Sequence, residues 1–391
     1  MKTTVTVKGR FHAFQLARSL QQHNSLQKLI TSYPTSHALR YGVQKKHVTS
    51  LIIHELLTRG WGKLPKAFSQ KDISPQLSAL FDWHTSLLLD NDTDIVTCWS
   101  SQGLRTIKKA KAKGMLTIVE RGSPHIEVQS ELVSNEFEKY NITERKTHPK
   151  IIERELAEYQ TAHFISIPSS FVKQSFIDKG FSSDKLLQTP YGVDTNLFKP
   201  KAKQDKTFRV MFCGSGMLRK GIQYLLQAFS ELKLPNAELW IVGHIHDEIK
   251  PLIKKFANDN IIYKGSQAEN KLVDYYAQAS VFCLPSISEG LALVTLQALA
   301  CGLPIICTPN SGAGDVITHG KEGFIIPPCN IEAIKQQLSY CYENQNELTK
   351  MRIAARNRIE SAFTWQHYAE KTINNYEKAF ALFRDSKHQA S

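Results

Sequence analysis

Short runs of β-branched and aromatic residues alternate with amphipathic helical patterns along the chain, and this alternation constrains the fold more than any other feature. It is typical of parallel sheets with crossover helices. A first series of strands is predicted over Thr3–Lys8, Leu26–Thr31, Ile95–Trp99, Leu116–Glu120, His163–Ile167 and Leu186–Thr189. A second series is predicted over Phe208–Cys213, Glu238–Val242, Ile261–Lys264, Val281–Leu284, Ile305–Thr308 and Phe324–Ile326. Helices such as Ala13–Gln22 and Gly103–Lys113 fall between the strands, so we expect an α/β fold with doubly wound parallel sheets.

A chain of 391 residues is too long for one ordinary core, so we expect two domains. The segment "TPYGVDTNLFKPKAKQDKTFRV" separates the two strand series and contains Pro190, Gly192 and Pro200. We therefore predict domains over 1–192 and 193–364. Ligands of doubly wound sheets bind beyond the carboxyl ends of the strands, which predicts a site in the cleft between the domains.

Composition indicates a globular protein of a reducing compartment. The apolar share is 42% and the charged share 22%, and the seven cysteines show no paired metal-binding spacing. The amino terminus "MKTTVTVKGR" lacks a signal-peptide core, and no apolar run reaches the length of a membrane span. We expect a cytoplasmic protein with reduced thiols.

Positive charge is concentrated at the start of the chain. The formal net charge is +13, and no acid precedes Glu55. Eight bases do: Lys2, Lys8, Arg10, Arg18, Lys28, Arg40, Lys45 and Lys46. A basic face with interleaved apolar residues suits the anionic inner face of a membrane or a phosphorylated acceptor, and the alternative is a solvated helix face. No nucleic-acid motif accompanies this charge, so we expect no nucleic-acid partner.

The loop "GSGMLRKG" follows the strand Phe208–Cys213 and has the outline of a diphosphate site. Gly214 and Gly216 allow a tight turn and a close approach by a ligand. Arg219 and Lys220 stand where a helix begins, so two cations join its free amides. The spacing excludes a nucleoside-triphosphate loop. Residues that merely turn and cap the chain are the alternative reading.

A second loop, "SISEG", places Glu289 at the carboxyl end of the strand Val281–Leu284, where a sugar can be bound. A helix is predicted from about Leu291 to Cys301, and Gln297 lies about 12 Å further along its axis. Only an extended ligand, such as a nucleotide-sugar, spans that gap. The alternative is an exposed loop acid and a glutamine turned to solvent.

The first half of the chain offers weaker signals. His125 opens a helix in "VERGSPHIEV", where Glu120 and Arg121 are expected to pair with each other. Gly9 is a candidate close-approach turn after the first strand, and Arg10 a candidate contact for an acceptor phosphate.

Together, "GSGMLRKG", "VGH", "SEGLALVTLQALACGLPIICTPNSGAGDVI" and the hinge "PSSFVKQSF…PYGVDTNLF" resemble the retaining glycosyltransferases of family 4, which have the GT-B fold. The carboxyl-terminal half is matched nearly throughout and the amino-terminal half more loosely. The tail "FTWQHYAEKTINNYEKAF" is similar to the closing helix of that family, so a helix over about 365–384 is expected to pack back onto the first domain.

The resemblance implies roles for individual residues. Glu289 contacts the donor sugar, Arg219 and Lys220 hold the diphosphate, and His125 approaches the reacting carbon. The expected donor-binding positions are Gly214, Ser215, Gly216, Gly243, Gly290, Leu291, Ala292, Leu293, Val294 and Gln297. The family pattern has a second acid where this chain has Gln297, and often an arginine where it has Ser215. A neutral amide should weaken ribose binding by about 1 kcal/mol.

The sequence therefore predicts transfer of a hexosyl unit from a nucleoside-diphosphate sugar to a sugar, lipid-linked or polysaccharide acceptor, with retention and in polysaccharide or glycolipid synthesis. No cofactor or metal is expected, because "GHIHD" (residues 243–247) is the nearest candidate and has weak ligand spacing. One alternative is a sugar phosphorylase or nucleotide-sugar epimerase of the same fold. Another is a non-catalytic nucleotide-sugar-binding or membrane-docked scaffold.

Overall fold

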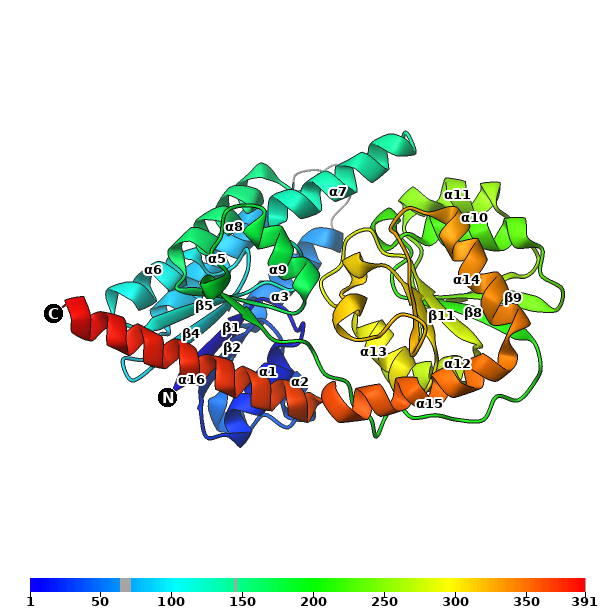
Figure 1. Cartoon of the computed structure of the whole chain (residues 1–391). Coiled ribbons are helices and arrows are strands. Elements are labelled where there is room, and N and C mark those ends of the chain that lie inside the picture. Colours follow the sequence, from blue (N-terminus) through cyan, green and yellow to red (C-terminus); the bar gives the residue numbers. More distant parts are fainter. Residues whose placement is uncertain (64–71, 144–145, 391) are drawn as a thin grey trace.

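Two parallel sheets, each enclosed by helices, stand side by side in the computed structural model, which describes residues 1–63, 72–143 and 146–390 (Figure 1). Within those ranges the first sheet has seven strands in the order β3-β2-β1-β4-β5-β6-β7. The second has six in the order β10-β9-β8-β11-β12-β13. The chain is thus built from two Rossmann-like domains, as expected for a GT-B protein.

The strands agree closely with those expected from the sequence. The first sheet contains β1 (Thr3–Val7), β2 (Leu26–Thr31), β3 (Val48–Ser50), β4 (Ile95–Trp99), β5 (Leu116–Glu120), β6 (Phe164–Ile167) and β7 (Leu186–Gln188). The second contains β8 (Phe208–Cys213), β9 (Ala237–Val242), β10 (Ile261–Gly265), β11 (Val281–Leu284), β12 (Ile305–Cys307) and β13 (Gly323–Ile325). Among the strands of the described residues, sequence reasoning missed only β3, a three-residue edge strand whose residues are all partly exposed.

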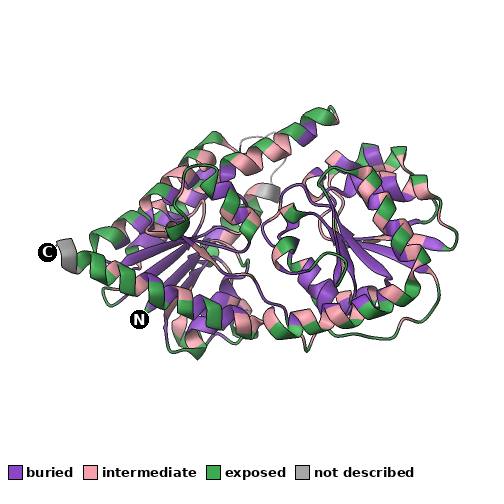
Figure 2. Ribbon diagram, in the orientation of Figure 1, coloured by how far each residue is buried: buried purple, intermediate pink, exposed green. Residues whose placement is uncertain are grey.

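Helices cover the sheets and bury the strands between them (Figure 2). Those of the first domain are α1 (Ala13–Gln22), α2 (Thr35–Arg40), α3 (Ile52–Lys63), α5 (Ser74–Leu87), α6 (Leu104–Ala112), α7 (Ile126–Lys139), α8 (Pro149–Thr161) and α9 (Ser170–Ile177). Those of the second are α10 (Ile222–Leu232), α11 (Lys250–Lys255), α12 (Leu272–Gln278), α13 (Leu293–Ala300), α14 (Ile331–Glu343) and α15 (Gln345–Ala362). Within the described residues, no helix combines the length and the apolar character that crossing a membrane requires.

The last helix, α16 (Trp365–Ala390), leaves the second domain and packs on α1 of the first. Its Tyr376 is buried, and the Tyr376 hydroxyl lies 3.0 Å from Thr97 Oγ1 of β4. The chain crosses between the domains twice at one place, because Val193 N donates a hydrogen bond of 2.9 Å to Phe363 O. Helix α16 therefore completes the core of the first domain.

The domains also touch across the side that faces the cleft. Ser169 Oγ donates a hydrogen bond of 2.7 Å to the Gly290 carbonyl, and Ser170 N donates one of 2.6 Å to Asp315 Oδ2. Gly290 lies so near the first domain that a Cβ on it would stand 1.8 Å from the Gly122 carbonyl oxygen. The two sheets are therefore held in a closed arrangement.

Strand order fixes where a ligand can enter. In the first sheet the connections reverse direction between β1 and β4, and in the second between β8 and β11. Loops after such paired strands diverge and leave a crevice at the carboxyl edge of the sheet. The closed arrangement brings the two crevices together.

Candidate active site

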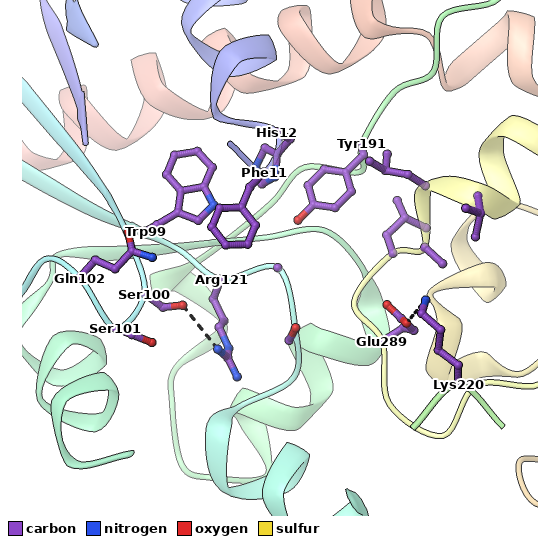
Figure 3. Close-up of a pocket in the computed structure, with 16 residues that line it drawn as sticks. Phe11, His12, Trp99, Ser100, Ser101, Gln102, Arg121, Tyr191, Lys220 and Glu289 are labelled. Carbon is purple, nitrogen blue, oxygen red and sulfur yellow. Dashed lines mark hydrogen bonds and ion pairs between the residues drawn. The ribbon is translucent and has the colours of Figure 1, made fainter. Parts of the chain in front are cut away.

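A cavity of about 430 Å³ lies where these crevices meet (Figure 3). Its walls come from the loops after β1, β4 and β5 on one side and after β8 and β11 on the other, together with Tyr191 of the interdomain segment. The lining residues are Phe11, His12, Trp99, Ser100, Ser101, Gln102, Arg121, Gly122, Ser123, Tyr191, Lys220, Glu289, Leu291, Ala292, Leu293 and Val294.

The carboxylate of Glu289 lies between two cations on the second-domain side. Glu289 Oε1 is 2.5 Å from Lys220 Nζ and 3.0 Å from Arg219 Nη1. Burial opposes the negative charge, but the attraction of both cations outweighs it and lowers the pKa of the Glu289 carboxyl. The structure thus brings together the three residues that sequence reasoning assigned to the diphosphate and the sugar.

Backbone contacts hold this cluster in place. The Arg219 carbonyl accepts hydrogen bonds from Ile287 N and Ser288 N, so the loops after β8 and β11 are tied together. Gly221 has φ +69, and a Cβ there would lie 1.9 Å from the Pro285 carbonyl oxygen. Only glycine fits a turn that carries the chain from Lys220 into α10 so close to the neighbouring loop.

The remaining expected donor positions surround the cluster. The β8 and β9 turns pack together, since Gly216 N donates a hydrogen bond of 2.7 Å to His244 O and Gly214 N one of 2.9 Å to Val242 O. A Cβ on Gly243 would lie 1.9 Å from the Gly214 carbonyl oxygen. Gly214, Ser215, Gly216 and Gly243 are not among the residues that line the cavity.

Helix α13 begins at the cavity wall. Ala292 N donates a hydrogen bond to Ser311 O, but no acceptor among the described residues takes the N–H groups of Leu293 and Val294. Such free amides at a helix start attract an anion.

Gln297 is buried and does not line the cavity. It is 8% exposed, and its Oε1 accepts a hydrogen bond of 3.2 Å from the buried Tyr276 hydroxyl. The alternative in which it turns to solvent is therefore wrong. Its contact with a ribose stays a prediction.

His125 is not brought to the cavity, contrary to the expectation that it approaches the reacting carbon. It caps α7, accepting a hydrogen bond from Glu127 N, and its ring packs against Tyr159, Phe176 and Phe181. Burial lowers the pKa of His125 to about 4. The ring turns inward because an aromatic cluster lies behind the loop, which no local pattern reveals.

Other first-domain expectations change as well. Arg10 is exposed, with Nη1 3.2 Å from the Tyr41 hydroxyl, and neither it nor Gly9 lines the cavity. Glu120 and Arg121 do not pair with each other.

Each instead has a partner from another segment. Glu120 Oε2 lies 3.3 Å from His12 Nε2, and Arg121 Nη1 lies 2.8 Å from Glu155 Oε2. The first-domain side of the cavity is lined instead by Phe11 and His12, which follow Arg10, and by Arg121.

Sequence reasoning missed an aromatic group on the first-domain side. Phe11, Trp99 and Tyr191 all line the cavity, and His12 packs between Trp99 and Tyr191 with centroid distances of 4.9 and 4.3 Å. Their positions in the sequence could have revealed them, because Phe11 follows β1 and Trp99 ends β4, and residues at the carboxyl ends of strands face the ligand site.

Within the described residues, no group of three or more His, Cys, Asp or Glu side chains is placed to hold a metal ion.

Comparisons with known proteins find relatives of part of this chain and of its fold. Residues 193–358 match the family described as glycosyl transferases group 1. The chain is 26% identical over 227 residues to the MMP alpha-(1->4)-mannosyltransferase of Mycolicibacterium hassiacum, covering 57% of this chain and 55% of that protein. It is 26% identical over 209 residues to a GDP-mannose-dependent monoacylated alpha-(1-6)-phosphatidylinositol monomannoside mannosyltransferase of Corynebacterium glutamicum, covering 47% and 54%.

The matched part thus spans about half the length of these curated relatives. The structure resembles that of sucrose-phosphate synthase from Thermosynechococcus elongatus with a TM-score of 0.70. That match has 16% identity and covers 98% of this chain and 100% of the other, so it shows a shared fold.

Proposed function

We propose that this chain, which carries a group 1 glycosyltransferase domain over residues 193–358, transfers a hexosyl unit from a nucleoside-diphosphate sugar to an acceptor hydroxyl with retention. The observation that carries the proposal is the ion pairing of Lys220 and Arg219 with Glu289, of which Lys220 and Glu289 line the interdomain cavity. Two cations beside one carboxylate suit a diphosphate and a sugar bound next to each other.

The chemistry follows from the charge that develops. The bond between the anomeric carbon and the diphosphate oxygen breaks, and the leaving diphosphate keeps the electron pair. Lys220, Arg219 and the free amides of α13 are already placed around that charge, so little reorganisation is needed. The acceptor oxygen then bonds to the same face of the sugar and passes its proton to the leaving phosphate.

A double displacement through the enzyme would require a carboxylate free to attack the anomeric carbon, and Glu289 is instead held by Lys220 and Arg219. Among the residues described as lining the cavity, Glu289 is the single acid. This favours same-face attack without a covalent sugar–enzyme intermediate. The proposed cations also supply the charge that a divalent metal would otherwise provide.

The relatives named above are mannosyltransferases, one of them GDP-mannose-dependent, so GDP-mannose is the first donor to test. A thermal-shift screen of nucleoside diphosphates and their sugars identifies the donor, since a ligand of the folded state raises its melting temperature. Turnover of that donor should fall by at least 100-fold in Lys220→Ala and in Glu289→Ala while both variants stay folded. Unchanged turnover in both contradicts the assignment, and a strict requirement for inorganic phosphate favours a phosphorylase.

The acceptor is proposed to lie at an anionic membrane surface, as in glycolipid synthesis. Helix α3 exposes Ile52, Ile53, Leu56 and Leu57, with exposed fractions between 42% and 57%. Exposed Arg40, Lys45 and Lys46 precede it in the chain and complement anionic headgroups.

Co-sedimentation with phosphatidylglycerol vesicles should weaken with salt and fall in the double variant Ile53→Ser/Leu56→Ser. Binding that is absent from wild type, or unchanged in that variant, contradicts the membrane surface without affecting the transfer reaction.

A further inference from the structure

Phe11 is an exposed aromatic ring held in a strained backbone at the wall of the cavity. Its exposed fraction is 62%, and its φ is +41, in the left-handed region that residues other than glycine and asparagine rarely adopt. It is the one aromatic residue with positive φ in the part of the chain described. Strain of this kind persists where the surrounding structure enforces it, and it collects at ligand sites.

The surroundings hold this ring in position. The Phe11 ring stacks on Trp99, with centroids 6.5 Å apart and planes 18° from parallel. Trp99 is only 5% exposed, so it supports the Phe11 ring from behind. The Phe11 ring is the one that is exposed at the cavity (Figure 3). The Phe11 ring also lies against Gly9, where a Cβ would stand only 3.1 Å from the ring. The absence of a side chain at Gly9 leaves room for the ring.

Polar groups beside the ring are fixed as well. Lys8 N donates a hydrogen bond of 2.5 Å to Gln102 Oε1. This bond connects the loop after β1 to the loop after β4 and fixes the orientation of the Gln102 side-chain amide. Ser101 has φ +71, and its N–H donates a hydrogen bond of 2.6 Å to the buried Glu158. Ser100, Ser101 and Gln102 all line the cavity, so hydroxyl and amide groups border an apolar ring face.

An aromatic face with polar groups at its edge matches a pyranose ring, which has C–H groups on one face and hydroxyls around its rim. An acyl or prenyl chain would require an apolar groove without that polar border. Phe11 stands on the first-domain wall, whereas Lys220 and Glu289 stand on the second. The ring that stacks on Phe11 is therefore the acceptor and not the donor.

We infer that Phe11 is the stacking platform for a pyranose acceptor, with Trp99 as its support and Gln102 as a hydroxyl-binding neighbour. This inference deepens the proposed function. The binding of a pyranose to Phe11 does not depend on the transfer reaction, but the identification of that pyranose as the acceptor does. The sugar ring would lie flat on Phe11 and present a hydroxyl toward Glu289 and Lys220. The platform specifies the class of acceptor, a sugar ring, whether free or attached to a carrier.

Saturation-transfer NMR on the full chain tests the platform without turnover, using methyl α-D-mannopyranoside and methyl α-D-glucopyranoside as probes and mannitol as the acyclic control. Wild type should transfer saturation to at least one pyranoside, strongest on protons of one ring face, and much less to mannitol. Phe11→Trp should retain the signal, and Phe11→Asn should lose at least fivefold. Tyr263→Asn, which removes an exposed ring outside the cavity, should behave as wild type.

Phe11→Asn should melt at the wild-type temperature or above, because asparagine tolerates the left-handed backbone. Equal saturation in wild type and Phe11→Asn overturns the inference, as does a wild type that saturates neither pyranoside or saturates mannitol equally. Calorimetric titration with GDP and UDP keeps the two proposals apart. A wild type that binds pyranoside but no nucleotide contradicts the transferase, whereas nucleotide binding with unchanged pyranoside signals contradicts only the platform.

Discussion

Lys220 Nζ lies 2.5 Å from Glu289 Oε1, so the cation expected to hold the donor diphosphate is already neutralised by the acid expected to hold the donor sugar. Arg219 shares the same carboxylate oxygen. A nucleoside diphosphate must therefore compete with Glu289 for both cations. The donor sugar offers Glu289 hydroxyl partners in exchange, which a nucleotide without sugar does not.

Glu289→Gln should therefore separate binding from turnover. With the competing charge removed, the affinity for a nucleoside diphosphate should rise about tenfold, equal to about 1.4 kcal/mol. Turnover should fall by about 100-fold or more, because the carboxylate no longer holds the sugar. Isothermal titration and initial rates measure the two effects. Glu269→Gln, an exposed acid of the same domain, is the charge control and should change neither; weaker nucleotide binding in Glu289→Gln would contradict the competition.

His125→Asn should alter acid stability and leave catalysis nearly intact. The pKa of His125 is lowered by burial from 6.5 to about 4, so the unfolded chain binds this proton first and stability falls as pH drops from 6.5 toward 4. Asparagine still caps α7 and does not titrate, so unfolding free energy should depend on pH less steeply, by about 1.4 kcal/mol per pH unit.

Burial also lowers the pKa of His54 and of His163 to about 4, and both keep their contribution to the acid dependence in this variant. Denaturant unfolding between pH 6.5 and 4.5 measures it. A 100-fold loss of turnover at pH 7.5 would instead restore His125 to the catalytic site.

Gly290→Ala should open the molecule. A methyl group at Gly290 would stand 1.8 Å from the Gly122 carbonyl oxygen, so the closed arrangement becomes impossible while neither sheet is disturbed. Small-angle scattering should show a larger radius of gyration, and turnover should fall by at least 100-fold. Gly314→Ala, where a Cβ meets nothing within 4 Å, is the matched control. Full turnover in Gly290→Ala would show that catalysis does not need this contact.

Gln297→Glu should strengthen nucleotide binding if this position contacts the ribose. A carboxylate can keep the hydrogen bond from the Tyr276 hydroxyl on one oxygen and accept one from a ribose hydroxyl on the other. The expected gain is about fivefold in affinity, or about 1 kcal/mol. Gln297→Leu removes one of the two acceptors of the buried Tyr276 hydroxyl, leaving the Val294 carbonyl at 3.3 Å, and should lower the melting temperature slightly. Calorimetry that finds weaker binding in Gln297→Glu would place the ribose elsewhere.

Most of the fold could be read from the sequence, because each buried parallel strand is a short apolar run that local composition reveals. Strand β3 escaped since its three residues are half-buried and polar or small. The group of Arg219, Lys220 and Glu289 was accessible because two of these residues are adjacent and the third follows a clear strand.

The aromatic group on the first-domain side of the cavity could not be predicted from the sequence in this way. Phe11, Trp99 and Tyr191 come from three distant segments, and only the order of strands brings them together. The direction of the His125 ring likewise depends on Phe176 and Phe181, which pack from a different helix and turn. Neither the convergence of the three aromatic residues nor the packing of the His125 ring can be predicted from residue type and spacing.

The position of helix α16 affects the order in which the chain can fold during synthesis. Its buried Tyr376 belongs to the core of the first domain, yet the ribosome makes it only after the whole second domain. The early half of the chain must therefore wait, with the surface beside α1 and β4 uncovered, until the later half has emerged and folded. Maturation of this protein should be a single late event, in which the first domain is completed by a segment that the second one delivers.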